Sequence, residues 1–276
     1  MDHFTYGALT PLLSFALSCA GCGAGLSCTA RARVTSGVAR TVWLLLGSVA
    51  IGGTGIWVMH FVAMLGFSVQ GAQIRYDVST TIASMLLAVA VVGVGLFLVH
   101  RPAGGTAALL TGGIVAGLGI AVMHYLGMAA MHVGVDIAYD PLLVVTSVVI
   151  AMAAATGALW LSARVRGAGA GAVATVVMGL AVSGMHYTGM AAMRITSYRL
   201  LGTPIEAPVT GLPATQFLVP LMGGIVVGTV ALLIVAAAWP TAAEMEAQAE
   251  FDAWTERQRE RQRSARRWPA RPGYHV

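Results

Sequence analysis

Long uncharged stretches are the feature that most limits how this chain can fold. About 20 apolar residues are enough for a helix to cross the hydrocarbon core of a bilayer. Seven stretches of at least 22 residues contain no Asp, Glu, Lys or Arg: His3–Ala30, Thr41–Ile74, Val78–Val99, Pro102–Val135, Pro141–Ala163, Gly167–Met193 and Ala207–Ala243. We therefore expect an all-α, polytopic membrane protein with seven transmembrane helices, surrounded by the lipid bilayer.

The composition excludes several classes of protein. Only 10% of the residues are charged and 57% are hydrophobic, whereas soluble domains are about 25% charged. The sequence shows no nucleotide-binding glycine loop, zinc-protease motif or catalytic triad, so we do not expect an enzyme. The net charge of +5 does not indicate nucleic acid as a partner, because the arginines flank the expected helices or lie in the C-terminal tail.

The arginines predict how the helices are oriented. The connections after the first, third and fifth expected helices carry six arginines and no acidic residue: Arg31, Arg33, Arg40, Arg101, Arg164 and Arg166. The other connections carry three arginines and four acids: Arg75, Arg194, Arg199, Asp77, Asp136, Asp140 and Glu206. Cytoplasmic loops are enriched in basic residues. We expect the N-terminus outside and the C-terminus inside a bacterial inner (cytoplasmic) membrane. The start lacks a basic segment, so the first helix is expected to be retained.

A short motif occurs three times and defines an internal repeat. The copies read WVMHFVAML from Trp57, AVMHYLGMAAM from Ala121 and SGMHYTGMAAM from Ser183, and their histidines are 64 and 62 residues apart. Tyr76-Asp77 and Tyr139-Asp140 precede the third and fifth expected helices. This periodicity predicts three parallel helix pairs followed by a seventh helix. Residues 1–240 are therefore expected to form one membrane domain.

Helical spacing predicts which side chains of each copy share a face. Residues at i, i+4 and i+7 lie on one side of a helix. The expected stripes join the histidines His60, His124 and His186 to the methionines Met64, Met128, Met131, Met190 and Met193, with Phe67 in the last position of the first copy. A glycine stands seven residues before each histidine: Gly53, Gly117 and Gly179. Small residues let helices approach closely, so each stripe is expected to face a neighbouring helix.

These stripes predict a soft metal site near the outer membrane face. All three lie in the outer half of helices that run in the same direction. Imidazole and thioether groups without a nearby carboxylate suit copper better than magnesium, calcium or manganese. The candidate ligands also include the methionine that precedes each histidine: Met59, Met123 and Met185. His132 and His3 are further histidines expected near this level.

Three alternatives stay open for the stripes. Paired histidines are also typical of haem ligation in a membrane redox protein. Methionine-rich stripes can pass Cu(I) across a bilayer, although here they stop at the outer half. Intramembrane histidine and methionine also serve as packing groups in a ligand-free scaffold. Cys19, Cys22 and Cys28 are interpreted as small packing residues in the cytoplasmic half of the first helix, far in depth from the histidines.

The repeated motif resembles the signature of the MHYT family of bacterial integral-membrane sensors. Met59-His60-Phe61, Met123-His124-Tyr125 and Met185-His186-Tyr187 carry the resemblance, with Gly-Met-Ala-Ala-Met following in two copies. It implies a seven-helix sensor whose Met, His and Tyr residues bind copper and detect oxygen, carbon monoxide or nitric oxide. Tyr125 and Tyr187 are then supporting residues, and Phe61 departs from the pattern.

The C-terminal tail differs from the rest of the chain. Many proteins of this family continue into a cytoplasmic output domain, which is not expected here. Thr241 and Glu244 fit a capping box, and the residues that follow are acidic up to Asp252 and basic from Arg257. We expect residues 241–267 to be helical, within a cytoplasmic tail of residues 241–276. This tail is a solvated helix, a contact for anionic lipid, or a docking surface for a separate signalling protein.

Overall fold

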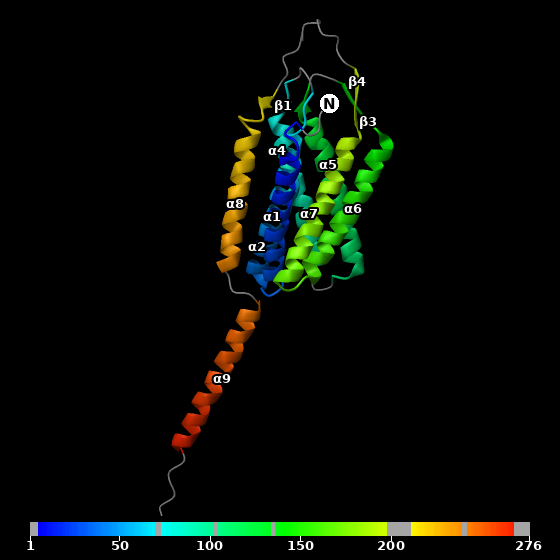
Figure 1. Ribbon diagram of the computed structural model, residues 1–276. Helices are drawn as coiled ribbons and strands as arrows, with labels where there is room; N and C mark the ends of the chain where they lie inside the picture. Colours follow the sequence, from blue (N-terminus) through cyan, green and yellow to red (C-terminus); the bar gives the residue numbers. More distant parts are fainter. Residues whose placement is uncertain are drawn as a thin grey trace, which may run out of the picture. The chain divides into compact units, whose positions relative to one another are not determined.

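The structure of this chain, a computed structural model, is dominated by long helices (Figure 1). It describes residues 5–69, 73–101, 104–133, 136–197, 211–238 and 242–267. Seven apolar helical spans in these residues are long enough to cross a membrane: α1 (Leu9–Ala32), the span Gly37–Met64, α4 (Val78–Val99), α5 (Thr106–Ala129), α6 (Pro141–Arg164), α7 (Ala168–Ala191) and α8 (Leu218–Ala238). The prediction of an all-α membrane protein with seven transmembrane helices is confirmed. The outward orientation of the N-terminus and the parallel pairing of repeats stay predictions.

The second span changes helix type along its length. It consists of α2 (Gly37–Ser48), the π-helix η1 (Val49–Val58) and α3 (Met59–Met64). Most π-helical segments are single-turn bulges, and they occur often at functional sites. Here the π-helical segment runs for 10 residues and ends at Val58, two residues before His60.

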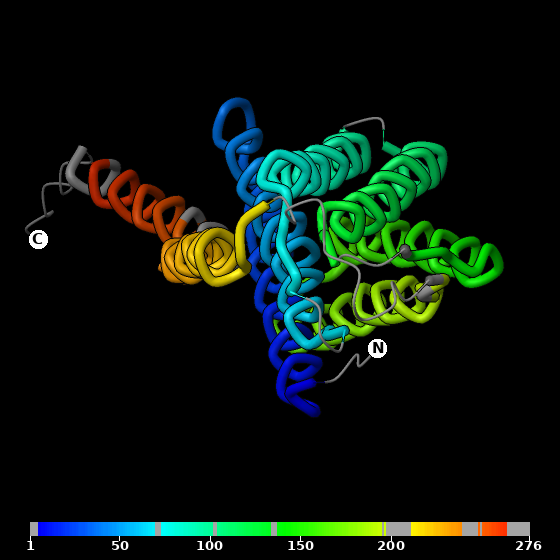
Figure 2. Tube along the Cα trace, turned by 90° about the horizontal axis from the view of Figure 1, so that it is seen from above, coloured from blue at the N-terminus to red at the C-terminus, as the bar shows by residue number. Residues whose placement is uncertain are grey.

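Six of the spans form a closed ring. In the order α1, second span, α4, α5, α6 and α7, each helix packs against the next, and α7 packs against α1 (Figure 2). The three helices that carry the repeated histidines therefore alternate with the other three. α8 lies outside the ring and contacts η1, where the hydroxyl groups of Thr54 and Thr229 are 2.5 Å apart. Because these helices alternate around the ring, the three motif helices all border the interior of the ring.

Close approach of neighbouring helices depends on glycine in each motif helix. A Cβ atom on Gly117 would lie 2.4 Å from Met152 Cα of α6, and one on Gly179 would lie 2.7 Å from Cys19 Sγ of α1. These contacts confirm the predicted helix-facing role of both glycines. In the second span, Gly52 makes the corresponding contact, 2.8 Å from the Ala88 carbonyl oxygen of α4, while Gly53 faces Ile225 of α8 at 3.6 Å. The π-helix takes more residues per turn, which accounts for the shift by one position.

Short strands cover the end of the bundle near the histidines. β1 (Arg75–Tyr76) lies between β2 (Met131–His132) and β5 (Leu212–Pro213). β3 (Asp136–Tyr139) pairs with β4 (Met193–Ser197). The prediction that Met131 and Met193 extend the helical stripes is therefore wrong. α5 and α7 end two residues before these methionines, because the chain turns there to pair with the strands before α4 and α6.

The Tyr-Asp marker of the repeat acts as a helix start. The Asp77 carboxylate accepts a hydrogen bond from the Thr80 backbone N–H, and that of Asp140 accepts from Leu142 and Leu143. Such N-caps satisfy backbone donors that have no partner within the helix. Hydrogen bonds from Ser79 and Thr80 lower the pKa of Asp77 to about 2. Asp77 is therefore ionised at neutral pH, and its negative charge stabilises the N-terminus of α4 through the helix dipole.

The C-terminal tail contains one long helix, α9 (Ala242–Arg267). It matches the helix expected over residues 241–267. Residues 237–276 form a unit separate from Met1–Ala236. Thr241 of the expected capping box lies outside the described residues, as do His3 and residues 268–276.

Candidate metal centre

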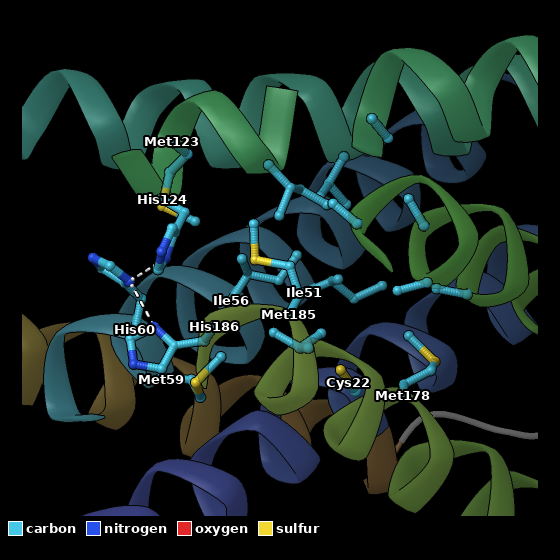
Figure 3. Close-up of a pocket in the computed structure, with 18 of the residues that line it drawn as sticks. Cys22, Ile51, Ile56, Met59, His60, Met123, His124, Met178, Met185 and His186 are labelled. Carbon is cyan, nitrogen blue, oxygen red and sulfur yellow. Dashed lines mark hydrogen bonds between the residues drawn. The ribbon is translucent and has the colours of Figure 1, made fainter. Parts of the chain in front are cut away.

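The three repeated histidines meet inside the ring of helices. His60 comes from α3, His124 from α5 and His186 from α7, and each is only 1% exposed. Figure 3 shows their rings converging at one end of an internal cavity. The predicted orientation of the stripes toward neighbouring helices is therefore confirmed for all three histidines.

Their Nδ1 atoms form a compact group with His60 at its centre. His60 Nδ1 lies 3.0 Å from His186 Nδ1 and 3.1 Å from His124 Nδ1. The rings pack edge to face, with centroids 4.8, 4.9 and 5.2 Å apart. One nitrogen from each ring can be chosen so that the set lies within 4.8 Å. This is the only such group of His, Cys, Asp or Glu side chains in the described part of the chain.

Hydrogen bonds between the imidazoles account poorly for the arrangement of the three Nδ1 atoms. A neutral imidazole nitrogen carries either one N–H or one lone pair. His60 Nδ1 can therefore form a well-aligned hydrogen bond with only one of its two neighbouring nitrogens. A cation can accept all three lone pairs at once. Metal–imidazole bonds of about 2.0 Å place three ligand nitrogens about 3.3–3.5 Å apart, close to the two Nδ1 distances at His60. The set as a whole lies within 4.8 Å, so His124 and His186 must move toward each other when an ion binds. The donor set therefore fits a metal ion bound between helices.

Two glycines that sequence reasoning overlooked allow the histidines to converge. A Cβ atom on Gly127 would lie 2.6 Å from His60 Nε2, and one on Gly189 would lie 2.3 Å from His124 Nε2. Each glycine stands three residues after its own histidine and contacts the histidine of the preceding copy. Ala63 holds the equivalent position in the first copy. The repeated Gly-Met pair in two copies was the signal that could have identified these residues.

Close packing against α1 supports the π-helix beneath His60. The Ser18 hydroxyl donates a 2.7 Å hydrogen bond to the Gly55 carbonyl oxygen. A Cβ atom on Gly21 would lie 2.2 Å from the Gly55 backbone nitrogen. Polar side chains can satisfy backbone groups that irregular helices leave free. The Ser18 contact therefore holds the backbone that leads into His60.

A small apolar cavity begins at the histidines and continues along the bundle interior. Its volume is about 50 Å³. Beside the histidines it is lined by the methionine that precedes each of them: Met59, Met123 and Met185. Cys22 of α1 lines the same cavity, as Figure 3 shows. The sequence placed this cysteine far from the histidines in depth, but one cavity joins them.

The other predicted methionines are buried but do not line this cavity. Met64, Met128 and Met190 are 0%, 1% and 4% exposed. Each lies one helical turn beyond its histidine, at the positions predicted for soft ligands. Met131 and Met193 are also buried, in β2 and β4. The contribution of each methionine to a metal site stays a prediction.

The aromatic residues of the first two motif copies pack against the tyrosines of the Tyr-Asp marker. Phe61 contacts Tyr76, with ring centroids 5.9 Å apart, and Tyr125 contacts Tyr139 at 5.7 Å. The Tyr125 hydroxyl forms a 2.7 Å hydrogen bond with Ser147. Burial raises the pKa of both Tyr76 and Tyr139, so these phenols stay neutral. The Tyr residues of the Tyr-Asp marker thus cover two of the motif copies.

Comparison with protein families identifies the repeat. The MHYT family, described as "Bacterial signalling protein N terminal repeat", matches residues 53–112 and 117–175. These ranges contain the first two histidines, and the third lies beyond them. No solved structure matches the chain.

Several curated signalling proteins are similar to the chain. The bifunctional diguanylate cyclase/cyclic di-GMP phosphodiesterase MucR of Pseudomonas aeruginosa is 42% identical over 172 residues, which are 60% of this chain and 25% of MucR. The cyclic di-GMP phosphodiesterase NbdA of the same organism is 33% identical over 245 residues, 87% of this chain and 30% of NbdA. The signaling protein YkoW of Bacillus subtilis is 34% identical over 197 residues, 69% of this chain and 24% of YkoW. The chain thus spans only 24–30% of the lengths of these relatives.

Proposed function

This chain belongs to the MHYT family of bacterial membrane signalling proteins, and on that premise we propose that it is a sensor whose repeated histidines hold a copper ion. It is a multi-pass inner-membrane protein. The observation that carries the proposal is the convergence of His60, His124 and His186, with Nδ1 distances of 3.0 and 3.1 Å around His60.

The choice of copper follows from the donor set. The site offers imidazole nitrogens and nearby thioether sulfurs, and no carboxylate belongs to the group. Imidazole binds copper in either redox state, whereas thioether favours Cu(I). We propose the three histidines as ligands, with Met64, Met128 and Met190 or the cavity-lining Met59, Met123 and Met185 as soft neighbours. Copper bound there would supply a redox change and an open coordination position.

The cavity supports a small apolar ligand as the signal. Its volume of about 50 Å³ is bounded almost wholly by apolar side chains, and such cavities stay dry and accept apolar guests. Oxygen, carbon monoxide and nitric oxide are small enough for this space. The residues of the chain hold such a molecule beside the histidines and exclude water. A change in helix packing around the site then carries the signal toward the other end of the bundle.

A haem group fits the site less well. Two imidazoles that ligate one iron from opposite faces are separated by about 4 Å, the sum of two bonds of about 2 Å. The macrocycle occupies the plane between them. His60 Nδ1 lies 3.0 and 3.1 Å from its two neighbours, which leaves no plane for a macrocycle in either pair, and the adjoining cavity of about 50 Å³ is too small for one beside His124 and His186. An absorption spectrum of the purified protein distinguishes the two cofactors.

We further propose that the tail passes the signal to a cytoplasmic signalling module. α9 is strongly polar and has clustered acidic and basic segments, unlike the apolar membrane domain. Two relatives are named as enzymes that make or degrade cyclic di-GMP, and a module of this kind is the proposed recipient. Deleting residues 245–276 is expected to leave copper content unchanged. Loss of copper in this variant would instead show that the tail supports the site.

The decisive experiment is copper stoichiometry and affinity of the purified full chain in detergent. We expect one copper ion per wild-type chain. Single His→Ala changes at positions 60, 124 and 186 should reduce affinity more than Met→Leu changes at positions 64, 128 and 190. The Met→Leu changes should mainly weaken Cu(I), measured by competition with a Cu(I) chelator.

A matched control separates the site from the general effect of losing a histidine. His132→Ala removes an imidazole from β2, outside the group of three, and should bind copper as wild type does. If the wild-type protein binds no copper, or if all three site variants bind copper as tightly as the wild type does, the histidines are packing groups.

A further inference from the structure

A second pocket lies at the end of the bundle opposite the strands, among the connections between helices (the lower end in Figure 1). Its volume is about 350 Å³, within the range of about 300–1,000 Å³ typical of small-molecule sites. Five cationic or titratable side chains line it: Arg33, Arg40, His100, Arg101 and Arg166. They come from the ends of α1, α4 and α6 and from the start of α2.

The positive charge of this pocket has no compensating acid. None of its lining residues is acidic, and the three connections that form it contain no Asp or Glu. Within the described residues, these arginines form no ion pair. Like charges held together repel one another, so an anion that enters the pocket lowers the electrostatic energy of the folded state.

Helix capping explains one of the arginines and leaves the others available. The Arg33 guanidinium donates to the carbonyl oxygens of Ser162 and Val165 at the end of α6. Burial lowers the pKa of Arg33, and the charge of Arg166 lowers it further. Arg101 and Arg166 are exposed and Arg40 is partly buried. The structure shows no capping hydrogen bond from these three side chains among its described residues.

His100 is a buried group with an unused nitrogen. It is 8% exposed, and its Nδ1 lies 3.0 Å from the Leu96 carbonyl oxygen. A carbonyl oxygen only accepts, so Nδ1 carries the hydrogen and Nε2 is the nitrogen that titrates. Nε2 makes no hydrogen bond of normal length and angle in the parts of the chain that are described, although the Ser162 carbonyl oxygen is near enough to the ring to influence its pKa. Such a buried atom in a cationic pocket indicates a missing ligand.

We propose that this pocket binds a phosphate ester, with Arg40, Arg101 and Arg166 as its charged contacts and His100 as a further donor. The planar guanidinium group matches two phosphate oxygens at once. Basic pockets between transmembrane helices on the cytoplasmic side also hold the headgroups of anionic lipids. A phosphorylated solute and an anionic phospholipid present the same chemistry to these residues. The arginine distribution predicts that this end of the bundle faces the cytoplasm.

The protonation of His100 makes binding dependent on pH. Burial lowers the pKa of His100, the carbonyls of Leu96 and Ser162 raise it, and the positive charges of Arg33 and Arg40 lower it. Without a ligand the ring is therefore mostly neutral at neutral pH. Protonation adds an N–H donor at Nε2, so an anion of constant charge binds more tightly as the pH falls. Replacing His100 with Gln removes this dependence.

The test uses the full chain in a neutral detergent and two probes. Thermal stability is measured against inorganic phosphate, with sodium chloride at matched ionic strength as the reference. Native mass spectrometry counts bound phosphatidylglycerol against phosphatidylcholine. Arg40→Gln and Arg166→Gln should each weaken binding roughly tenfold or more, the ratio expected for a lost charge-assisted hydrogen bond. Arg164→Gln is the matched control, because Arg164 lies in the last turn of α6 but does not line the pocket.

Each outcome bears directly on the proposal. Arginine-dependent binding of phosphatidylglycerol alone identifies a lipid headgroup site, and a response to phosphate identifies a site for a soluble phosphate ester. With phosphatidylglycerol, affinity should rise from about pH 8 to about pH 6 in the wild type and stay flat in His100→Gln. The proposal is overturned if neither probe binds, or if Arg164→Gln weakens binding as much as Arg40→Gln does.

Discussion

The first copy of the repeated motif differs from the other two in helix type and in sequence. His124 and His186 lie on continuous α-helices, α5 and α7, whereas His60 follows the 10-residue π-helix η1. The first copy also has Phe61 and Ala63 where the others have tyrosine and glycine. In the structure, His60 is the central member of the group and contacts both other histidines. The copy that departs most from the repeat thus holds the centre of the site.

A threefold repeat can therefore form an asymmetric site. The three motif helices alternate around the ring, an arrangement close to threefold symmetry. The longer turns of a π-helix shift the residues that face a neighbour, as the change from Gly53 to Gly52 shows. An asymmetric group of three imidazoles can give a bound ion two close ligands and one that is free to exchange.

The largest expected effect comes from removing the central histidine. His60→Ala should lower copper affinity by more than about 100-fold, beyond the 10–100-fold typical of residues that only orient a ligand. His124→Ala and His186→Ala should each retain measurable binding, because His60 still lies 3.0 or 3.1 Å from the histidine that remains. His60→Ala leaves only His124 and His186, whose ring centroids are the farthest apart of the three pairs, at 5.2 Å. Equilibrium competition with a copper chelator ranks the three variants. An equal loss in all three would show that the site is functionally symmetric.

A smaller loss of copper binding is expected when the histidines are displaced without being removed. Gly189→Ala adds a methyl group 2.3 Å from His124 Nε2, and Gly127→Ala adds one 2.6 Å from His60 Nε2. Either imidazole must move, so affinity should fall about 10–100-fold. Gly184→Ala is the matched control on α7, because its methyl group would meet no atom within 4 Å. Wild-type affinity in Gly189→Ala would contradict this account of the glycine.

The smallest effect concerns the stability of the π-helical copy. Gly52→Ala places a methyl group 2.8 Å from backbone atoms of Ala88 and Val89, which cannot move aside as a side chain can. We expect a loss of about 1–3 kcal/mol in the free energy of unfolding, as for other overpacked sites. Gly53→Ala has 3.6 Å to its nearest neighbour and should change stability little. Unfolding of the purified protein, followed by tryptophan fluorescence, compares the two adjacent positions.

The seven helices and the histidines could be predicted from local patterns. The length of each uncharged stretch sets the number of spans, because the cost of burying charge in lipid applies to each segment by itself. The motif placed His60, His124 and His186 at one depth, because it stands at a similar position in three spans that are expected to run in the same direction. The Tyr-Asp repeat was recognised as a marker of helix starts, and the structure adds that Asp77 and Asp140 cap α4 and α6.

Contacts between distant segments decided the rest. No local pattern shows that Gly127 approaches His60, that Met131 leaves the helix to pair with Tyr76, or that Cys22 shares a cavity with the histidines. The basic pocket likewise joins three connections that are far apart in the chain. Helix formation in a membrane satisfies backbone hydrogen bonds within one segment, so the sequence determined the spans. The positions of side chains between helices depend on packing among all of them, so the central place of His60 follows from contacts among three helices and from no single segment.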